Sequence, residues 1–159
     1  MTAIYIVRHA IAEERDAERW PDDAERPLSA DGEKRFRRAA RGLCVLVPEV
    51  DVVLSSPYVR AWRTAEILHE EAGWPPPERS DLLGASRAPA DGLDAIGARP
   101  EASSIAVVGH DPYLSHFISI LLTGDLDAVR IELKKGGVVH IDDNVLRWYA
   151  TPKTLVSIR

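Results

Sequence analysis

The amino-acid sequence predicts an α/β fold: three layers, α/β/α, in which a mostly parallel central sheet carries helices on both faces and ends in an antiparallel portion. Two observations lead to this prediction. Short runs rich in valine and isoleucine alternate with longer segments of helical periodicity, which is typical of a parallel sheet covered by helices. The last third of the chain instead places two strand-like runs on either side of Asp142–Asn144, which indicates an antiparallel hairpin.

Four runs of β-branched residues predict the main strands, because valine and isoleucine fit the surface of a sheet. These runs are Ala3–Val7, Asp51–Leu54, Ser104–Val108 and Val138–Ile141. Arg147–Ala150 predicts a fifth strand. Arg130–Leu133 and Glu78–Ser80 are weaker candidates.

Three stripes of apolar residues between these runs predict helices. The first helix begins after Ser29, whose hydroxyl can cap free backbone N–H groups, and Pro48 stops it. The third helix ends at Gly124, because glycine suits the turn that closes a helix. The stripes consist of Phe36, Ala40, Leu43, Cys44 and Val47; of Ala61, Ala65, Leu68 and Ala72; and of Leu114, Phe117, Ile118, Leu121 and Leu122.

Length and composition exclude several classes of protein. The chain has 159 residues, the size of one domain, and we expect residues 1–159 to form a single domain. With 20 basic and 25 acidic residues the net charge is −5, which gives no reason to expect a nucleic acid or an anionic membrane as partner. The single cysteine, Cys44, excludes an intrachain disulfide. No apolar run is long enough for a membrane span or a signal peptide, so we expect a cytoplasmic protein.

Basic side chains and histidines follow three of the predicted strands. Arg8 and His9 come after the first strand, Ser56 and Arg60 after the second, and His110 after Ser104–Val108. The carboxyl ends of parallel strands meet at one edge of the sheet, where α/β proteins build their sites. We therefore expect these residues to lie together.

Two imidazoles and two guanidiniums form a site suited to a phosphate dianion. The planar arginine fork binds phosphate oxygens through two hydrogen bonds, and neighbouring cations keep an imidazole neutral. A neutral imidazole can attack phosphorus and carry the phosphoryl group covalently. Positioned cations then stabilise the charge that develops on the transferred group. The sequence therefore predicts phosphoryl transfer.

Four sequence blocks resemble the histidine phosphatase superfamily, whose fold is phosphoglycerate mutase-like. Their order is that of the family, and the resemblance covers essentially the whole chain. The short length, the lack of a large insertion and LKKGG at Leu133–Gly137 resemble the SixA-type phosphohistidine phosphatases. Ala10 departs from the family pattern, which more often has glycine there. The blocks are IVRHA at Ile6–Ala10, RPLSADG at Arg26–Gly32, SSPYVRAWRTAEIL at Ser55–Leu68 and VVGHDP, which ends at Pro112.

The resemblance implies a role for each site residue. His9 would be the nucleophile that becomes phosphorylated, Arg8 and Arg60 would bind the phosphoryl oxygens, and His110 would donate a hydrogen bond to the same group. Ser56 and Arg63 are further candidates for substrate binding. Ser56 could instead only shape its loop, and Arg63 could be solvated. We expect no cofactor and no metal ion.

A general acid is missing from the expected place. Sugar-phosphate enzymes of the family carry a catalytic glutamate after the third strand, and the segment Ser80–Ser86 has none. Asp81, Asp91 and Asp94 are the carboxylates available instead. An alkoxide leaving group needs a proton from such an acid, whereas the imidazole of a protonated phosphohistidine leaves without charge.

We therefore predict a phosphatase with a covalent phosphohistidine intermediate that dephosphorylates phosphohistidine on a partner protein. The alternatives are a phosphomonoesterase for small molecules and a phosphoprotein-binding module without turnover. By resemblance, the partner would be a histidine-phosphotransfer domain or a phosphocarrier protein. A cationic face of the first predicted helix is either solvated or a docking surface for an acidic protein. It is formed by Arg35, Arg37, Arg38 and Arg41.

Overall fold

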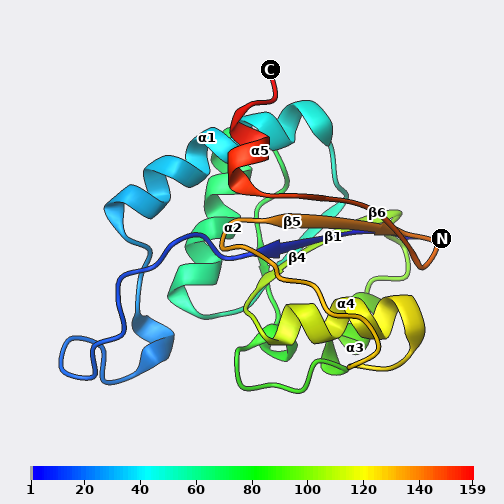
Figure 1. The fold of residues 1–159 in the computed structure, drawn as a ribbon, viewed down its shortest axis with the longest axis horizontal. Helices are drawn as coiled ribbons and strands as arrows, with labels where there is room; N and C mark the ends of the chain where they lie inside the picture. Colours follow the sequence, from blue (N-terminus) through cyan, green and yellow to red (C-terminus); the bar gives the residue numbers. More distant parts are fainter. Residues whose placement is uncertain (1) are drawn as a thin grey trace.

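The computed structural model describes residues 2–159 and has a six-stranded sheet in the order β3-β2-β4-β1-β5-β6 (Figure 1). The first four strands are parallel to one another, and β5 and β6 are antiparallel. This confirms the predicted fold class and its antiparallel end. The strands are β1 (Ala3–Arg8), β2 (Val52–Ser55), β3 (Glu78–Arg79), β4 (Ser104–Gly109), β5 (Val138–Asp142) and β6 (Val145–Ala150).

Helices cover both faces of the sheet (Figure 1). α1 (Ala30–Leu46), α2 (Val59–Ala72) and α5 (Pro152–Val156) pack on one face, and α3 (Asp91–Gly97) and α4 (Tyr113–Thr123) pack on the other. Two short 3-10 helices, η1 (Asp23–Glu25) and η2 (Asp81–Leu83), lie in the connections.

Successive side chains of β1 point to opposite faces of the sheet and so contribute to two hydrophobic cores, one on each face. Ile4 and Ile6 lie in the core under α4, whereas Val7 lies in the core under α1 and α2. This follows from the strand period of two residues. The longest helix, α1, has 17 residues, and within residues 2–159 no helix has both the length and the apolar character that crossing a membrane requires.

Local signals place the ends of the elements as expected. Ser29 Oγ accepts a hydrogen bond from the Gly32 N–H at 2.9 Å and begins α1. Gly124 ends α4 in the left-handed conformation with φ 81°. Asp143 and Asn144 have φ of 53° and 58° and form the turn between β5 and β6. Asparagine and aspartate are the non-glycine residues that best tolerate this conformation, and positive φ at both positions is typical of tight hairpins.

The prediction of a strand at Arg130–Leu133 is wrong. Its carbonyl groups bond side chains rather than a neighbouring strand: Ser115 Oγ donates to the Ile131 oxygen at 3.0 Å, and Arg8 Nη1 donates to the Leu133 oxygen at 2.7 Å. The short helices α3 and α5 were not predicted, because seven and five residues are too few to show a helical period.

Gly42 sets the distance between α1 and α5. A Cβ atom at this position would lie 1.7 Å from the backbone oxygen of Leu155, so any side chain would force the two helices apart. We expect Gly42→Ala to lower the free energy of unfolding by about 1–3 kcal/mol, the usual cost of overpacking. Gly97→Ala is the matched control, because no heavy atom lies within 4 Å of its Cβ position. Urea denaturation measures both; equal effects would contradict this account of the α1–α5 contact.

Candidate active site

The site lies where β1, β2 and β4 end side by side. Val108 of β4 pairs with Val7 on one side and Ser55 on the other. The pairing continues one residue further, because the His9 N–H donates to the Gly109 oxygen at 2.9 Å. On the other side the Ser56 N–H donates to the Val108 oxygen at 3.0 Å. These backbone bonds fix where the loops after the three strands begin.

The two histidines face each other across this edge. The ring centroids of His9 and His110 are 5.3 Å apart, and both residues are buried, with 6% and 2% of their surface exposed. The ring of Tyr58 also lies beside His110, at a centroid distance of 4.9 Å. The structure thus brings together the two imidazoles that the sequence predicted for one site.

The hydrogen bonding of His9 determines which ring nitrogen is free. Nδ1 of His9 lies 2.7 Å from the Ala10 carbonyl oxygen. A carbonyl oxygen can only accept, so Nδ1 carries the proton and donates it. In the neutral ring the lone pair is then on Nε2. This is the atom that can attack phosphorus.

Burial keeps His9 in its neutral form. Desolvation lowers the pKa of His9 to about 3; the bond to the Ala10 oxygen opposes this shift, and the charges of Arg60 and Arg8 add to it. The pKa of His110 is also lowered, first by burial and then by His9 and Arg60. Both imidazoles are therefore uncharged at neutral pH.

Ser56 sets the orientation of His110. The Ser56 hydroxyl oxygen lies 2.8 Å from His110 Nε2 and accepts a hydrogen bond from the Tyr58 N–H at 3.2 Å. Among residues 2–159 the Ser56 hydroxyl proton has no other acceptor within hydrogen-bond distance, so it is donated to Nε2, which puts the ring proton of His110 on Nδ1. Ser56 is fully buried behind the ring. Its contact with His110 Nε2 indicates a positioning role, and direct substrate contact by Ser56 stays a prediction.

The two arginines are fixed by backbone oxygens. Arg8 Nη1 donates to the Leu133 oxygen at 2.7 Å, and Arg60 Nη1 donates to the Asp23 oxygen at 2.7 Å. Arg60 is 3% exposed and lies in the first turn of α2. Its own carbonyl accepts from the Thr64 hydroxyl, and Thr64 Oγ1 accepts from the Ala10 N–H at 3.0 Å. Thr64 therefore ties the arginine helix to the loop that carries His9.

Unpartnered polar atoms gather in this site. Within residues 2–159, five buried side-chain nitrogen or oxygen atoms lack a hydrogen-bond partner. Three of the five belong to the expected catalytic residues: Arg8 Nε, Arg60 Nε and His110 Nδ1. A buried donor without a partner costs free energy, and such groups are typical of places where a ligand supplies the acceptor.

Asp23 and Arg26 are site residues that the sequence reasoning missed. Asp23 Oδ2 accepts from Arg60 Nη2 at 2.9 Å, and its Oδ1 accepts from Arg26 Nε at 2.8 Å. The pKa of Asp23 is lowered, mainly by the hydrogen bond from Arg26, so the carboxylate stays ionised. Arg26 stands inside one of the family blocks, but nothing in the sequence pairs Asp23 with an arginine 37 residues away.

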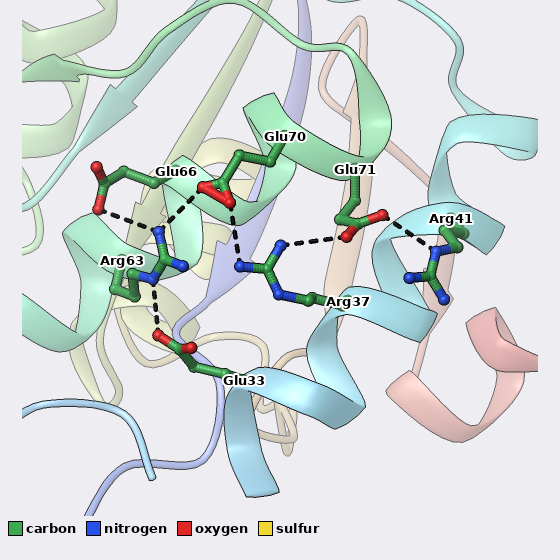
Figure 2. A network of polar contacts seen from close by, with 7 residues as sticks. All are labelled: Glu33, Arg37, Arg41, Arg63, Glu66, Glu70 and Glu71. Atoms are coloured by element: carbon green, nitrogen blue, oxygen red, sulfur yellow. Dashed lines mark hydrogen bonds and ion pairs between the residues drawn. The ribbon is translucent and has the colours of Figure 1, made fainter. Parts of the chain in front are cut away.

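Arg63 lies outside this group of contacts. Figure 2 shows it in an ion-pair network between α1 and α2, where it contacts Glu33 at 2.7 Å and Glu70 at 3.0 Å. Arg37 and Arg41, expected either on a solvated helix face or on a docking surface for an acidic protein, belong to the same network through Glu70 and Glu71. These pairs join the two helices, and the substrate role considered for Arg63 stays a prediction.

Two of the three candidate acids after β3 pair with arginines, and the third is exposed. Asp81 pairs with Arg79 at 2.8 Å, Asp91 pairs with Arg87 at 3.0 Å, and Asp94 is exposed on α3. In the described part of the chain, none of these carboxylates contacts a catalytic residue. The same residues 2–159 contain no group of three or more His, Cys, Asp or Glu side chains that could hold a metal ion.

Comparison with known proteins agrees with this geometry. Residues 4–93 match the model of the histidine phosphatase superfamily (branch 1). An uncharacterized protein of Picosynechococcus sp. is 31% identical over 147 residues, which cover 91% of this chain and 87% of the relative.

Solved structures share the fold. The protein histidine phosphatase SixA complexed with tungstate superimposes with a TM-score of 0.84 at 22% identity, over 97% of this chain and 99% of the other. A mutant phosphoserine phosphatase from Entamoeba histolytica in complex with phosphoserine gives a TM-score of 0.70 at 15% identity, over 98% and 100% of the two chains. These similarities confirm the phosphoglycerate mutase-like fold.

The neutral histidines make stability depend on pH. The pKa of both histidines is lower in the folded protein than in the unfolded chain. Their contribution to stability is complete above the unfolded-state pKa and is lost as the pH falls toward the folded-state pKa. We expect the free energy of unfolding to decrease from about pH 6.5 to 4.5, by up to about 1.4 kcal/mol per pH unit for each histidine. Urea denaturation at several pH values measures this slope. His9→Gln and His110→Gln should each reduce it; an unchanged slope in both variants would contradict the burial argument.

Proposed function

Because the chain belongs to the histidine phosphatase superfamily (branch 1), we propose that it is a phosphatase that removes the phosphoryl group from phosphohistidine on a partner protein. The proposed catalytic residues are Arg8, His9, Arg60 and His110. A histidine-phosphotransfer domain or a phosphocarrier protein is the kind of partner that the sequence resemblance implies.

The reaction has two displacements at phosphorus. In the first, Nε2 of His9 forms a bond to phosphorus while the bond from phosphorus to the substrate imidazole breaks, and that imidazole keeps the electron pair. If its other nitrogen carries a proton, it leaves as a neutral ring. In the second, water attacks the phosphorus on His9, releases inorganic phosphate and restores the free imidazole. Arg8, Arg60 and the Nδ1–H of His110 stabilise the charged oxygens in both steps.

One observation carries the choice of substrate. Among the described residues, Asp23 supplies the only carboxylate in hydrogen-bond contact with a catalytic residue, and Arg26 and Arg60 keep it ionised. An ionised carboxylate has no proton to give to a leaving oxygen. Such a site suits a leaving group that needs no general acid, and the imidazole of phosphohistidine is one.

A phosphomonoesterase for small molecules is the second candidate. Its support is the fold shared with a phosphoserine phosphatase, because the serine oxygen of phosphoserine is an alkoxide leaving group. The likeness to the protein histidine phosphatase SixA supports the first candidate instead. A module that only binds phosphoprotein is less favoured, because both histidines and both arginines are present and lie together.

Substitution of the catalytic residues tests the mechanism. We expect His9→Ala to abolish turnover of phosphohistidine, and Arg60→Ala or His110→Ala to reduce kcat about 100-fold or more, as for a lost transition-state donor. Brief incubation of the native protein with substrate should leave an acid-labile, alkali-stable phosphate on His9. Arg63→Gln is the control and should keep kcat close to that of the native protein, since its partners are glutamates of α1 and α2. Full activity in His9→Ala would end this mechanism.

Substrate preference tests the missing acid. We expect kcat/KM to fall in the order phosphohistidine peptide, nitrophenyl phosphate, alkyl phosphate, because each step in this order needs more help from a general acid. The alkyl phosphate should lag by a factor of roughly 10²–10⁴, the usual contribution of such an acid. A higher kcat/KM for a sugar phosphate than for phosphohistidine would favour the second candidate. If Asp81→Asn or Asp91→Asn then removed the activity on the sugar phosphate, that aspartate would be the general acid, contrary to its ion pair with an arginine in the structure.

A further inference from the structure

Two clefts open beside Arg8. One, the basic groove, has a volume of about 710 Å³ and runs between α1, the segment after Glu132 and the start of α5. Its lining includes apolar side chains, among them Ile11, Phe36, Leu133 and Pro152. The other cleft, of about 740 Å³, lies on the α4 side. Arg8 lines both clefts, so each of them reaches the site that binds phosphate in the proposed function.

The basic groove carries positive charge although the chain is acidic overall. Five basic residues line it against one acid, Glu132, in a protein of net charge −5. Lys135 and Lys153 are exposed, and neither forms an ion pair with any residue from 2 to 159. The five basic residues are Arg8, Arg35, Lys134, Lys135 and Lys153.

The remaining ion pairs of the groove are weak. Arg35 pairs with Asp31 at 3.0 Å and Lys134 with Glu132 at 3.2 Å, but all four side chains are more than 60% exposed. Ion pairs this exposed contribute little free energy, so their basic side chains can readily bind another anion instead. The groove therefore presents donors that a negatively charged ligand can use.

The second cleft has no such excess of charge. Arg8, Arg130 and His116 line it together with Asp111 and Asp127, so its two arginines are balanced by two aspartates. An acidic ligand is therefore attracted to one of the two clefts, the basic groove.

The groove is tied to the catalytic residues through backbone bonds. The Gly136 N–H lies 3.0 Å from the carbonyl oxygens of both Arg8 and His9, and the Arg8 N–H donates to the Gly137 oxygen at 3.1 Å. Gly136 has φ 79°, which glycine adopts without strain. Lys134 and Lys135 come just before this glycine. The basic side chains are thus held at a fixed place beside the nucleophile.

We propose that the basic groove binds an acidic segment of the phosphoprotein, next to the phosphohistidine in its sequence or its fold, with apolar side chains of that segment on the groove floor. The inference rests on the proposed function and names the chemistry of its partner. Complementary charge at the rim of an interface raises the association rate and selects among partners. A small polyanion would use the charge of the groove but not its apolar floor, and an anionic membrane is tested below.

Binding of peptides tests the groove without turnover. The probes are a fluorescein-labelled, unphosphorylated peptide with aspartate, glutamate, leucine and phenylalanine around one histidine, and its twin with asparagine and glutamine in place of the acids. We expect the acidic peptide to bind at least about 10-fold more tightly and to lose this advantage at high salt. Lys135→Glu/Lys153→Glu should abolish the difference. Arg147→Glu, a charge reversal at an exposed residue of β6 outside the groove lining, is the control and should retain the difference.

Turnover then separates this proposal from the proposed function. With the histidine of both peptides phosphorylated, the double variant should lose about 10-fold more in kcat/KM on the acidic peptide than on its twin without acids. Equal binding of the two peptides overturns the groove proposal, even if phosphohistidine is hydrolysed fast. Tighter binding to phosphatidylglycerol vesicles than to the acidic peptide also overturns it. Selective binding of the acidic peptide without hydrolysis of phosphohistidine leaves the groove proposal standing and overturns the proposed function.

Discussion

The pairing of β4 with both β1 and β2 is the constraint on which the site depends. Because Val108 is paired on both sides, the loops after the three strands start at the same level of the sheet. The backbone bonds of His9 and Ser56 to β4 extend this alignment past the strands. Two histidines about 100 residues apart in the chain thereby come within 5.3 Å of each other. The chemistry proposed for the site begins with a register of main-chain hydrogen bonds.

That placement has an energetic consequence. Two imidazoles and two guanidiniums are buried together, and burial is the main cause that lowers the pKa of both histidines. Because both rings are neutral, the fold does not spend free energy on burying two more positive charges beside Arg8 and Arg60. Asp23 offsets part of the positive charge of Arg60, and Arg26 holds Asp23 in place. The same arrangement that makes burial tolerable supplies a nucleophile with a free lone pair.

The sequence predicted the strands that carry the site, because β-branched runs and strand-end residues are local signals. It also predicted that Arg8, His9, Arg60 and His110 would lie together, since parallel strands end at one edge. It failed at Arg130–Leu133, whose carbonyls are used by side chains of residues distant in sequence. It missed Asp23 for the same reason, because its bond to Arg60 joins two elements, η1 and α2, that are distant in sequence. Contacts set by tertiary structure leave no periodic signal in a sequence.

Arg8 connects the catalytic centre with the basic groove, so a ligand in the groove alters the field at His9. An acidic segment beside Arg8 would offset part of the charge that helps to lower the pKa of His9. Burial, however, is the largest cause of that shift, and Arg8 contributes less than Arg60. A docked segment would also cover the cleft further and strengthen desolvation. With the proposed acidic segment in the groove, His9 would therefore stay neutral, and the groove would select a partner without switching off the nucleophile next to it.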